Sequence, residues 1–445
     1  MQKNDSSLIV LMLILILFNS CGNDNSFFTA VQQGDSTKIN QLIEKGQDVN
    51  ALNKEGESAL ILASKNGHRE VVQVLLERGA EVQLVSFMDG ITALMAAAQN
   101  GHLGIVKMLL KNGAQINFQS PSSKNSSLIF AVMNNHYEVV QALLNSGADP
   151  DLQNEKESNA LLEAVQNANA EILNSLLEYD ADVNLVGNYG QTPLLLALGN
   201  ENWEISKILL NKGADIKLAD KNGWTPLMQA VNNQYEEIVG QMLQKQVDVN
   251  AQSKDGWTAL MLAVNKSNFN PVETLVRNNA DVNLKTHFNG WTALSCAIGQ
   301  GEFQIVKFLI ENGANVNAEI MFSEWSILSI AASKGYVEIL DLLLKNGCPV
   351  NQKNSHGRTA LMEAARFGSM NSSRILLDAG AEIDVKDEEG VTALMFAVKN
   401  KDEALVEFLV NQGADRSLRD NYNRTALEIA RDLEIPTISK LLTIR

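Results

Sequence analysis

Three of the five histidines recur at one spacing, a pattern that could in principle bind a metal ion. His68, His102 and His136 are separated by 34 residues each. Imidazole nitrogens bind zinc at about 2.1 Å, so nitrogens that share one ion lie only about 3 to 4 Å apart. Equivalent side chains of successive repeats are held apart by the packing distance of helices, about 8 to 10 Å. We therefore expect these histidines to hydrogen-bond neighbouring loops, and we predict no metal site.

The two cysteines in the body of the chain could form a disulfide or supply a nucleophile. Cys296 falls within an expected helix and Cys348 in the loop that closes the following repeat, at positions where small buried side chains are usual. The repeat brings no histidine and acid together beside either thiol, as nucleophilic catalysis would need. We expect both cysteines to be structural and unpaired.

Four tryptophans recur at one position, three residues before a leucine that marks each repeat. The candidate protein-binding residues are these four and two phenylalanines of neighbouring loops: Trp224, Trp257, Trp291, Trp325, Phe288 and Phe322. Large rigid side chains lose little entropy when a partner covers them, so a row of aromatics is typical of a binding hot spot. The alternative is that each tryptophan packs against the next loop and stiffens the stack.

The elements that would position these side chains belong to one repeated unit, which is clearest from Thr286 to Glu319. Thr292 can cap a short helix that Gly301 ends, and a second amphipathic helix ends at Gly313. The residues after Gly313 have no helical period and lead into the next unit, as an extended loop or hairpin would. A single unit cannot bury its apolar faces, so it must stack on copies of itself.

The repeat runs almost uninterrupted along the chain with a period of 33 or 34 residues. Its marker leucines are Leu60, Leu94, Leu128, Leu161, Leu194, Leu227, Leu260, Leu294, Leu328, Leu361, Leu394 and Leu427. With strings such as Thr225-Pro226-Leu227 and Gly213-Ala214-Asp215, the chain from Ser26 onward resembles the ankyrin repeat family. The resemblance implies an all-α ankyrin repeat solenoid, elongated and curved, in which β-hairpin-like loops join helix-turn-helix units. It also implies that the tryptophan position lies on a concave, protein-binding face.

Glycine is missing at several helix ends where the family usually has it. The substitutes are Asn135, Ala168, Glu201, Gln234, Ser267 and Lys401 after first helices, and Asp180, Gln246 and Asn279 after second helices. A side chain forced to positive φ costs about 1 kcal/mol relative to glycine. We therefore expect the middle of the array to be its weakest part.

The N-terminus is similar to a bacterial lipoprotein signal. An apolar run of eleven residues, Leu8 to Phe18, is too short to span a bilayer, which takes about 20, and suits the centre of a secretory signal. The small residues Ser20 and Gly22 flank Cys21, whose thiol we expect to carry the lipid. Cleavage without lipidation and an uncleaved anchor are the alternatives.

These patterns predict the following organisation: a signal peptide at 1–20, a short tether at 21–25, an N-terminal capping unit at 26–52, eleven repeats at 53–419 and a C-terminal capping unit at 420–445. The formal charge of −16 and the lack of a basic run disfavour nucleic acid as a partner. No nucleotide-binding glycine loop or metal motif is present, so we expect no cofactor and no small-molecule substrate.

The leading hypothesis is a non-enzymatic protein-protein interaction scaffold, exported and tethered by lipid on Cys21 to a bacterial membrane, facing the periplasm or the cell surface. One alternative is a structural or protective envelope protein without a single specific site. Another is a soluble periplasmic or secreted effector that binds host proteins. The sequence names no partner, because the specificity of a repeat scaffold lies in scattered surface residues.

Overall fold

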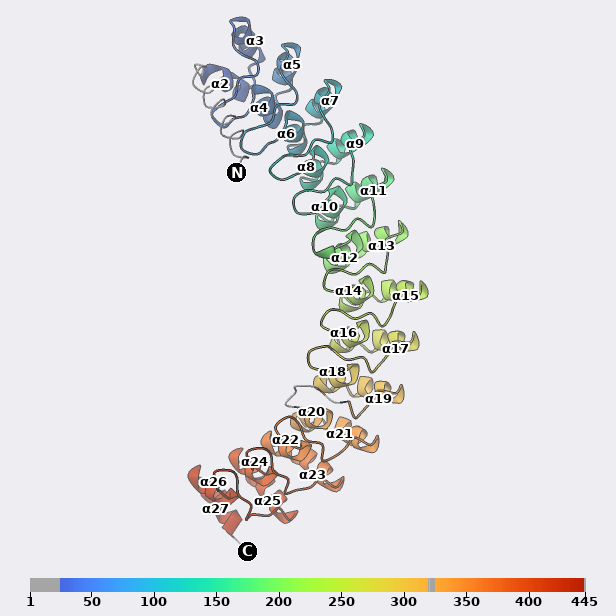
Figure 1. Ribbon diagram of the computed structural model, residues 1–445, viewed down its shortest axis with the longest axis vertical. Helices are drawn as coiled ribbons and strands as arrows, with labels where there is room; N and C mark the ends of the chain where they lie inside the picture. The colour runs from blue at the N-terminus through green and yellow to red at the C-terminus, as the bar shows by residue number, and fades with distance from the viewer. Residues whose placement is uncertain (1–24, 319, 321–324, 444–445) are drawn as a thin grey trace, which may run out of the picture. The chain divides into compact units, whose positions relative to one another are not determined.

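The structure is a computed structural model that describes residues 25–318, 320 and 325–443 of the 445-residue chain. Two of the predicted site residues, Cys21 and Phe322, lie outside the described residues. The chain divides into two compact units, residues 1–215 and 216–445, and each consists of helix pairs (Figure 1).

The first unit contains six helix pairs in its described part, and its first helix begins at Asn25, the last residue of the predicted tether. The helices are α2 (Asn25–Gln33), α3 (Ser36–Glu44), α4 (Ala59–Asn66), α5 (Arg69–Glu77), α6 (Ala93–Gln99), α7 (Leu103–Lys111), α8 (Ser127–Met133), α9 (Tyr137–Asn145), α10 (Ala160–Gln166), α11 (Ala170–Glu178), α12 (Pro193–Gly199) and α13 (Trp203–Asn211), with the short 3-10 helix η1 (Asn188–Gly190) before α12.

The second unit contains seven pairs in its described part, which also includes the predicted aromatic site residues other than Phe322. The helices are α14 (Pro226–Asn232), α15 (Glu236–Gln244), α16 (Ala259–Asn265), α17 (Phe269–Arg277), α18 (Ala293–Gln300), α19 (Phe303–Glu311), α20 (Ile327–Lys334), α21 (Val337–Lys345), α22 (Ala360–Arg366), α23 (Met370–Asp378), α24 (Ala393–Lys399), α25 (Glu403–Asn411), α26 (Ala426–Asp432) and α27 (Pro436–Thr443).

The ends of the helices follow the predicted caps. The Thr292 side chain accepts a hydrogen bond from the N–H of Ser295 at the start of α18, and Gly301 ends that helix with φ 79°. An oxygen at the N-cap binds an N–H that the helix leaves unpaired, and glycine reaches positive φ without steric cost. The capping residues therefore fix where each short helix begins and ends.

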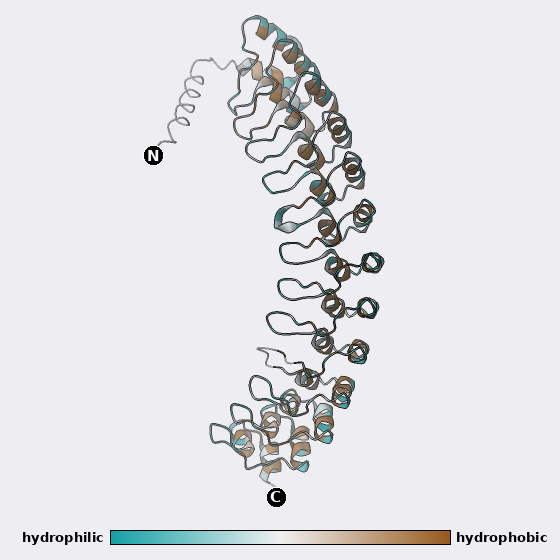
Figure 2. Ribbon diagram, turned by 45° about the vertical axis from the view of Figure 1, so that its right-hand side comes forward, coloured by the Kyte–Doolittle hydropathy of each residue, from teal (hydrophilic) through white to brown (hydrophobic). Residues whose placement is uncertain are grey.

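The core of each unit lies between two rows of helices. First helices pack on first helices, as in α4 with α6 and α20 with α22, and second helices pack on second helices. The first helices are almost wholly buried, and Figure 2 shows them as predominantly hydrophobic. Leu94 and Met95 of α6, for example, are 1% and 0% exposed. Methionine thus fills this buried place on the first helix with apolar contacts.

Hairpin-like loops join the pairs, although the described residues contain no β-strand and only two isolated bridges, Leu52 with Ser58 and Val85 with Thr92. Neighbouring loop tips exchange single backbone hydrogen bonds, such as that from the N–H of His287 to the carbonyl of Asp255. The loops of successive repeats are therefore joined edge to edge.

Two sets of side chains link successive repeats, and the first of them is the predicted histidine set. The Nε2 atoms of His68, His102 and His136 lie 2.9, 3.1 and 3.0 Å from the carbonyl oxygens of residues 32, 65 and 99 in the preceding repeat. Six asparagines accept a hydrogen bond from a backbone N–H of the following repeat, at 2.7 to 2.9 Å: Asn50, Asn117, Asn184, Asn250, Asn283 and Asn351. For Asn317, the residue at the position of the N–H donor in the following repeat is Pro349, which has no N–H to donate. Both sets are structural.

The nine residues that replace glycine at helix ends all have positive φ. These residues have φ between 54° and 66°, as in Ala168 at 55° and Asn279 at 66°. Each of them therefore carries the strain that glycine would avoid.

Replacing Ala168 by glycine is expected to raise the free energy of unfolding by about 1 kcal/mol, because the backbone there already has the conformation that glycine prefers. Urea denaturation followed by circular dichroism would measure the change. As a control, Ala142→Gly in the interior of α9 should lower the free energy by about 1 kcal/mol. Destabilisation by both substitutions would contradict the strain argument.

Candidate protein-binding surface

The tryptophans are held between a loop and the start of a first helix. The backbone N–H groups of Trp224, Trp257 and Trp291 donate to the side-chain oxygens of residues 220, 253 and 286, at 2.8, 3.1 and 2.9 Å. The residue after each of the four tryptophans is the threonine or serine that caps the helix. The indoles are thus attached to backbone that is fixed on both sides.

All four indoles are half-buried, so none is sealed inside the core and none projects freely into solvent. Phe288 lies at a loop tip with 83% of its surface exposed. Phe288 does not line the pocket that Trp291 and Trp325 share, so the structure places it apart from them.

A pocket of about 350 Å³ lies among α18, α20 and α22, which are successive first helices of the second unit. Trp291 and Trp325 line it together with Ile330 of α20 and Phe367, the residue after α22. The rings of Trp325 and Phe367 lie 6.0 Å apart between centroids, at an interplanar angle of 35°. Three neighbouring repeats thus contribute to one apolar hollow, while Trp224 and Trp257 do not line it.

The pocket has room because residue 299 of α18 is a glycine. A Cβ atom at Gly299 would lie 3.5 Å from Cζ3 of Trp291, which is ordinary van der Waals contact. At the same place in other repeats stand long side chains such as Lys65, Gln99 and Gln166. A side chain of that length at residue 299 would extend over the indole and fill the hollow.

Sequence reasoning missed Phe367 and Gly299. Phe367 stands at the repeat position that directly follows the position of Gly299. At the position of Phe367, other repeats have Asn, Lys or Gln in nearly every case. It is 52% exposed, which is unusual for a phenylalanine. Aligning the repeats by position would have shown one exposed aromatic at a polar place.

Basic side chains flank the aromatic ones. Lys334 is the charged residue among the pocket's lining, and the guanidinium of Arg366 lies 5.3 Å from the centre of the Phe367 ring. Arg366 also pairs with Glu363 at 3.5 Å, and burial raises the pKa of that carboxyl above its usual range. The pocket is therefore apolar with a locally positive edge.

The two body cysteines are free and buried, as predicted. Burial raises the pKa of Cys296 to about 12, and burial raises the pKa of Cys348 to about 12 as well. Because the thiolate is the reactive form, neither thiol is suited to nucleophilic chemistry near neutral pH. Among the described residues no group of three or more His, Cys, Asp or Glu is placed to hold a metal ion.

In a Cys21→Ala background, Cys296 and Cys348 are expected to resist alkylation by iodoacetamide at about pH 8, because burial keeps them protonated and covered. Both should react fully once the chain is unfolded in urea. Mass spectrometry of the alkylated peptides would measure this, and rapid labelling of either thiol in the folded protein would contradict the expectation.

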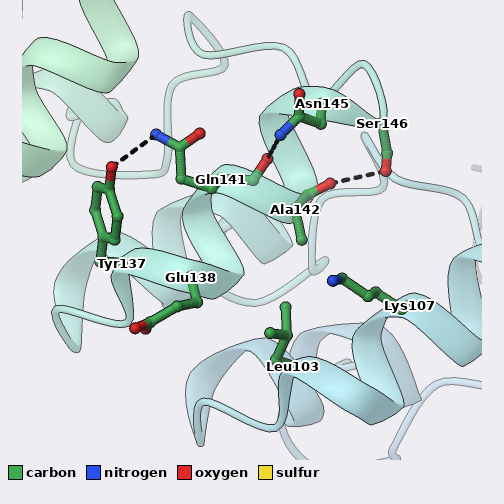
Figure 3. A pocket seen from close by; sticks show the side chains of 8 residues that line it. All are labelled: Leu103, Lys107, Tyr137, Glu138, Gln141, Ala142, Asn145 and Ser146. Carbon is green, nitrogen blue, oxygen red and sulfur yellow. Dashed lines mark hydrogen bonds between the residues drawn. The ribbon is translucent and has the colours of Figure 1, made fainter.

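A larger hollow of about 510 Å³ lies between the second helices α7 and α9 of the first unit (Figure 3). Its polar side chains already have partners. Asn145 donates to the carbonyl of Gln141 and Ser146 to that of Ala142, at 2.8 and 2.7 Å, while Gln141 donates to the hydroxyl of Ser175 in α11 at 2.5 Å. These groups do not converge on a common point. We therefore interpret this hollow as a solvated groove between helices.

The chain matches the family described as ankyrin repeats (3 copies) over residues 27–120, 128–220, 161–253, 200–286, 227–320 and 319–387, and the one described as ankyrin repeats (many copies) over residues 376–430. These matches cover most of the chain, so the protein belongs to the ankyrin repeat family. Ankyrin repeats generally act as non-enzymatic scaffolds for protein-protein interaction. Comparison with curated proteins gives no significant match. No helix in the described ranges combines the length and apolarity needed to cross a bilayer.

Proposed function

We propose that this protein is an exported, lipid-anchored scaffold that binds a protein partner on the first-helix face of its second unit. The observation that carries the binding proposal is the hollow lined by Trp291, Trp325 and Phe367. Half-buried aromatic side chains around a pocket are the usual anchor points of protein interfaces. Trp224 and Trp257 stand at the same repeat position in the two preceding repeats and would extend this surface, whereas Phe288 lies apart from it at a loop tip.

Affinity capture from membrane extracts of the native source would test the binding proposal. The Trp291→Ala, Trp325→Ala double variant is expected to lose a partner that the wild type retains, with unchanged circular dichroism. Trp203→Ala is the matched control, since Trp203 is also half-buried but belongs to a second helix of the first unit. Equal recovery of every partner by wild type and double variant would remove the aromatic surface from the proposal.

Export and anchoring rest on the sequence of the first residues. Leu8 to Phe18 has the length of a secretory signal's apolar centre, and Cys21 follows between two small residues. A lipid on Cys21 would hold the repeats beside a membrane without any spanning helix.

Radiolabelled palmitate is expected to enter the wild-type protein and not the Cys21→Ala variant, because Cys21 supplies the acylated thiol. Cys296→Ala is the control and should still incorporate label, since that thiol is buried. Gel autoradiography of the immunoprecipitated chain makes the measurement. Label in the Cys21→Ala variant would defeat the anchoring proposal, and a soluble unlabelled wild type would favour the secreted effector instead.

A further inference from the structure

We propose that the pocket among α18, α20 and α22 binds an extended segment of the partner in which a large apolar side chain is followed closely by a carboxylate. This inference rests on the proposed binding function and adds the chemistry of the partner. It has two independent grounds, the shape of the pocket and the charge at its edge.

The pocket suits one inserted apolar side chain. Its volume of about 350 Å³ is near the lower end for ligand sites, which span about 300 to 1,000 Å³. The indoles of Trp291 and Trp325, with Ile330 and Phe367, provide apolar walls from three repeats. Covering such surfaces removes apolar area from water, which is the main source of affinity at the centre of an interface.

The positive charge beside the pocket favours an acidic residue close to the inserted side chain in the partner segment. Lys334 lines the pocket, and it forms no ion pair within residues 25–318, 320 and 325–443. Arg366 lies 5.3 Å from the centre of the Phe367 ring, and it shares the buried carboxylate of Glu363 with Arg358, at 3.5 and 3.9 Å.

This local charge is opposite to that of the whole chain, whose formal charge is −16. A strongly acidic protein repels acidic partners at long range, so a carboxylate can be held only where basic side chains gather. Lys334 forms no ion pair with the described residues, so its ammonium group gives up only water to them when it pairs with a partner carboxylate. The charge complementarity therefore favours an acidic segment over a basic one at this site.

Selection from a phage-displayed library of random dodecapeptides on the immobilised full-length protein would test the inference. Enriched peptides are expected to share a large apolar residue with Asp or Glu within about four residues, the distance an extended chain covers to reach Lys334. Selection on Lys334→Glu should instead enrich Lys or Arg at that place. Lys266→Glu is the matched control, since Lys266 occupies the same repeat position, directly after α16, and does not line the pocket.

A second variant blocks the pocket without removing any aromatic side chain. Gly299→Gln places a long side chain over Trp291 and also improves helix propensity, so the thermal midpoint should not fall. The affinity of the best peptide, measured by isothermal titration calorimetry, should drop by about 30-fold, the effect of losing one anchor contact. Gly199→Gln, at the same repeat position in α12, should leave the affinity unchanged.

The outcomes separate this inference from the proposed function. If the peptides need Trp291 and Trp325 but show no acidic preference, or keep that preference with Lys334→Glu, the proposed partner carboxylate is wrong. The proposed binding surface would still stand. Peptides that bind equally to Gly299→Gln and to the tryptophan variants would overturn both. A library that yields no specific binder would also count against both.

Discussion

Replacing Arg358 by alanine is expected to lower the free energy of unfolding by about 3 to 5 kcal/mol, the usual cost of leaving a buried charge without its partner. The Nε atom of Arg358 lies 3.1 Å from Asp387, and one of its terminal nitrogens lies 3.9 Å from Glu363. Both carboxylate side chains are only 1% exposed, and the guanidinium also lies 5.3 Å from the Phe396 ring. Urea denaturation, with hydrogen exchange to locate the loss, would measure it.

The control for Arg358 is an ion pair on the surface. Arg277 lies 2.6 Å from Glu273, but its side chain is 73% exposed, so Arg277→Ala should cost about 0.5 kcal/mol or less. A loss of similar size in the two variants would contradict the argument from burial.

The destabilisation by Arg358→Ala should also depend on pH. Burial raises the pKa of Glu363 above its usual range, although Arg366 and Arg358 oppose this. A raised pKa gives stability that is present below the unfolded-state pKa and is lost as the pH rises through the folded-state pKa. Removing Arg358 raises the folded-state pKa of Glu363 further, so acid restores more stability to the variant than to the wild type. The difference between them should therefore shrink as the pH falls from neutral towards the ordinary pKa of a glutamate side chain.

Replacing Gly256 by alanine is expected to cost about 3 kcal/mol, because the new methyl group has no space. Gly256 has φ +84°, and a Cβ there would lie 2.6 Å from the backbone nitrogen of His287 and 2.8 Å from Cα of Thr286. Those atoms belong to the next loop's backbone and cannot rotate away, so overpacking adds about 1 to 3 kcal/mol to the cost of positive φ.

Gly79→Ala separates the two causes. Gly79 has φ +83°, nearly the same as Gly256, but nothing lies within 4 Å of a Cβ added there. Its substitution should therefore cost only about 1 kcal/mol, the cost of strain alone. Denaturation of both variants gives the comparison, and equal losses would show that the contact with the next loop can relax.

The sequence predicts the helix pairs well because the signals that set them are local. Thr292 and Gly301 enclose one helix, and residues such as Ala168 take positive φ because the chain must turn there whatever side chain is present. The contacts between repeats made by His68 and Asn50 are also predictable, since each partner stands at a fixed offset in the neighbouring repeat.

The pocket and the buried ion pairs are less predictable because their members stand at different repeat positions. Trp325 precedes its first helix, whereas Phe367 follows the first helix of the next repeat, and only stacking brings the two rings to 6.0 Å. Arg358 and Asp387 likewise come from loops of different repeats. Such pairs leave no periodic signal in the sequence. Aligning the repeats can single out an unusual residue such as Phe367, but it does not show which residue of another repeat it contacts.

The histidine contacts limit which repeats can be neighbours if the chain is rebuilt from cassettes. A Cβ at Gly67 or Gly101 would lie 2.6 Å from the ring of His102 or His136, so a repeat with this histidine fits only after a repeat whose first helix ends in glycine. Where the first helix of the preceding repeat is followed by Asn135, the next repeat has Asn169, and the two amides bond at 2.9 Å. When repeats are grafted or shuffled, the two residues that meet between neighbouring repeats should therefore be moved together. This requires the chain to be cut within a repeat and not between two repeats.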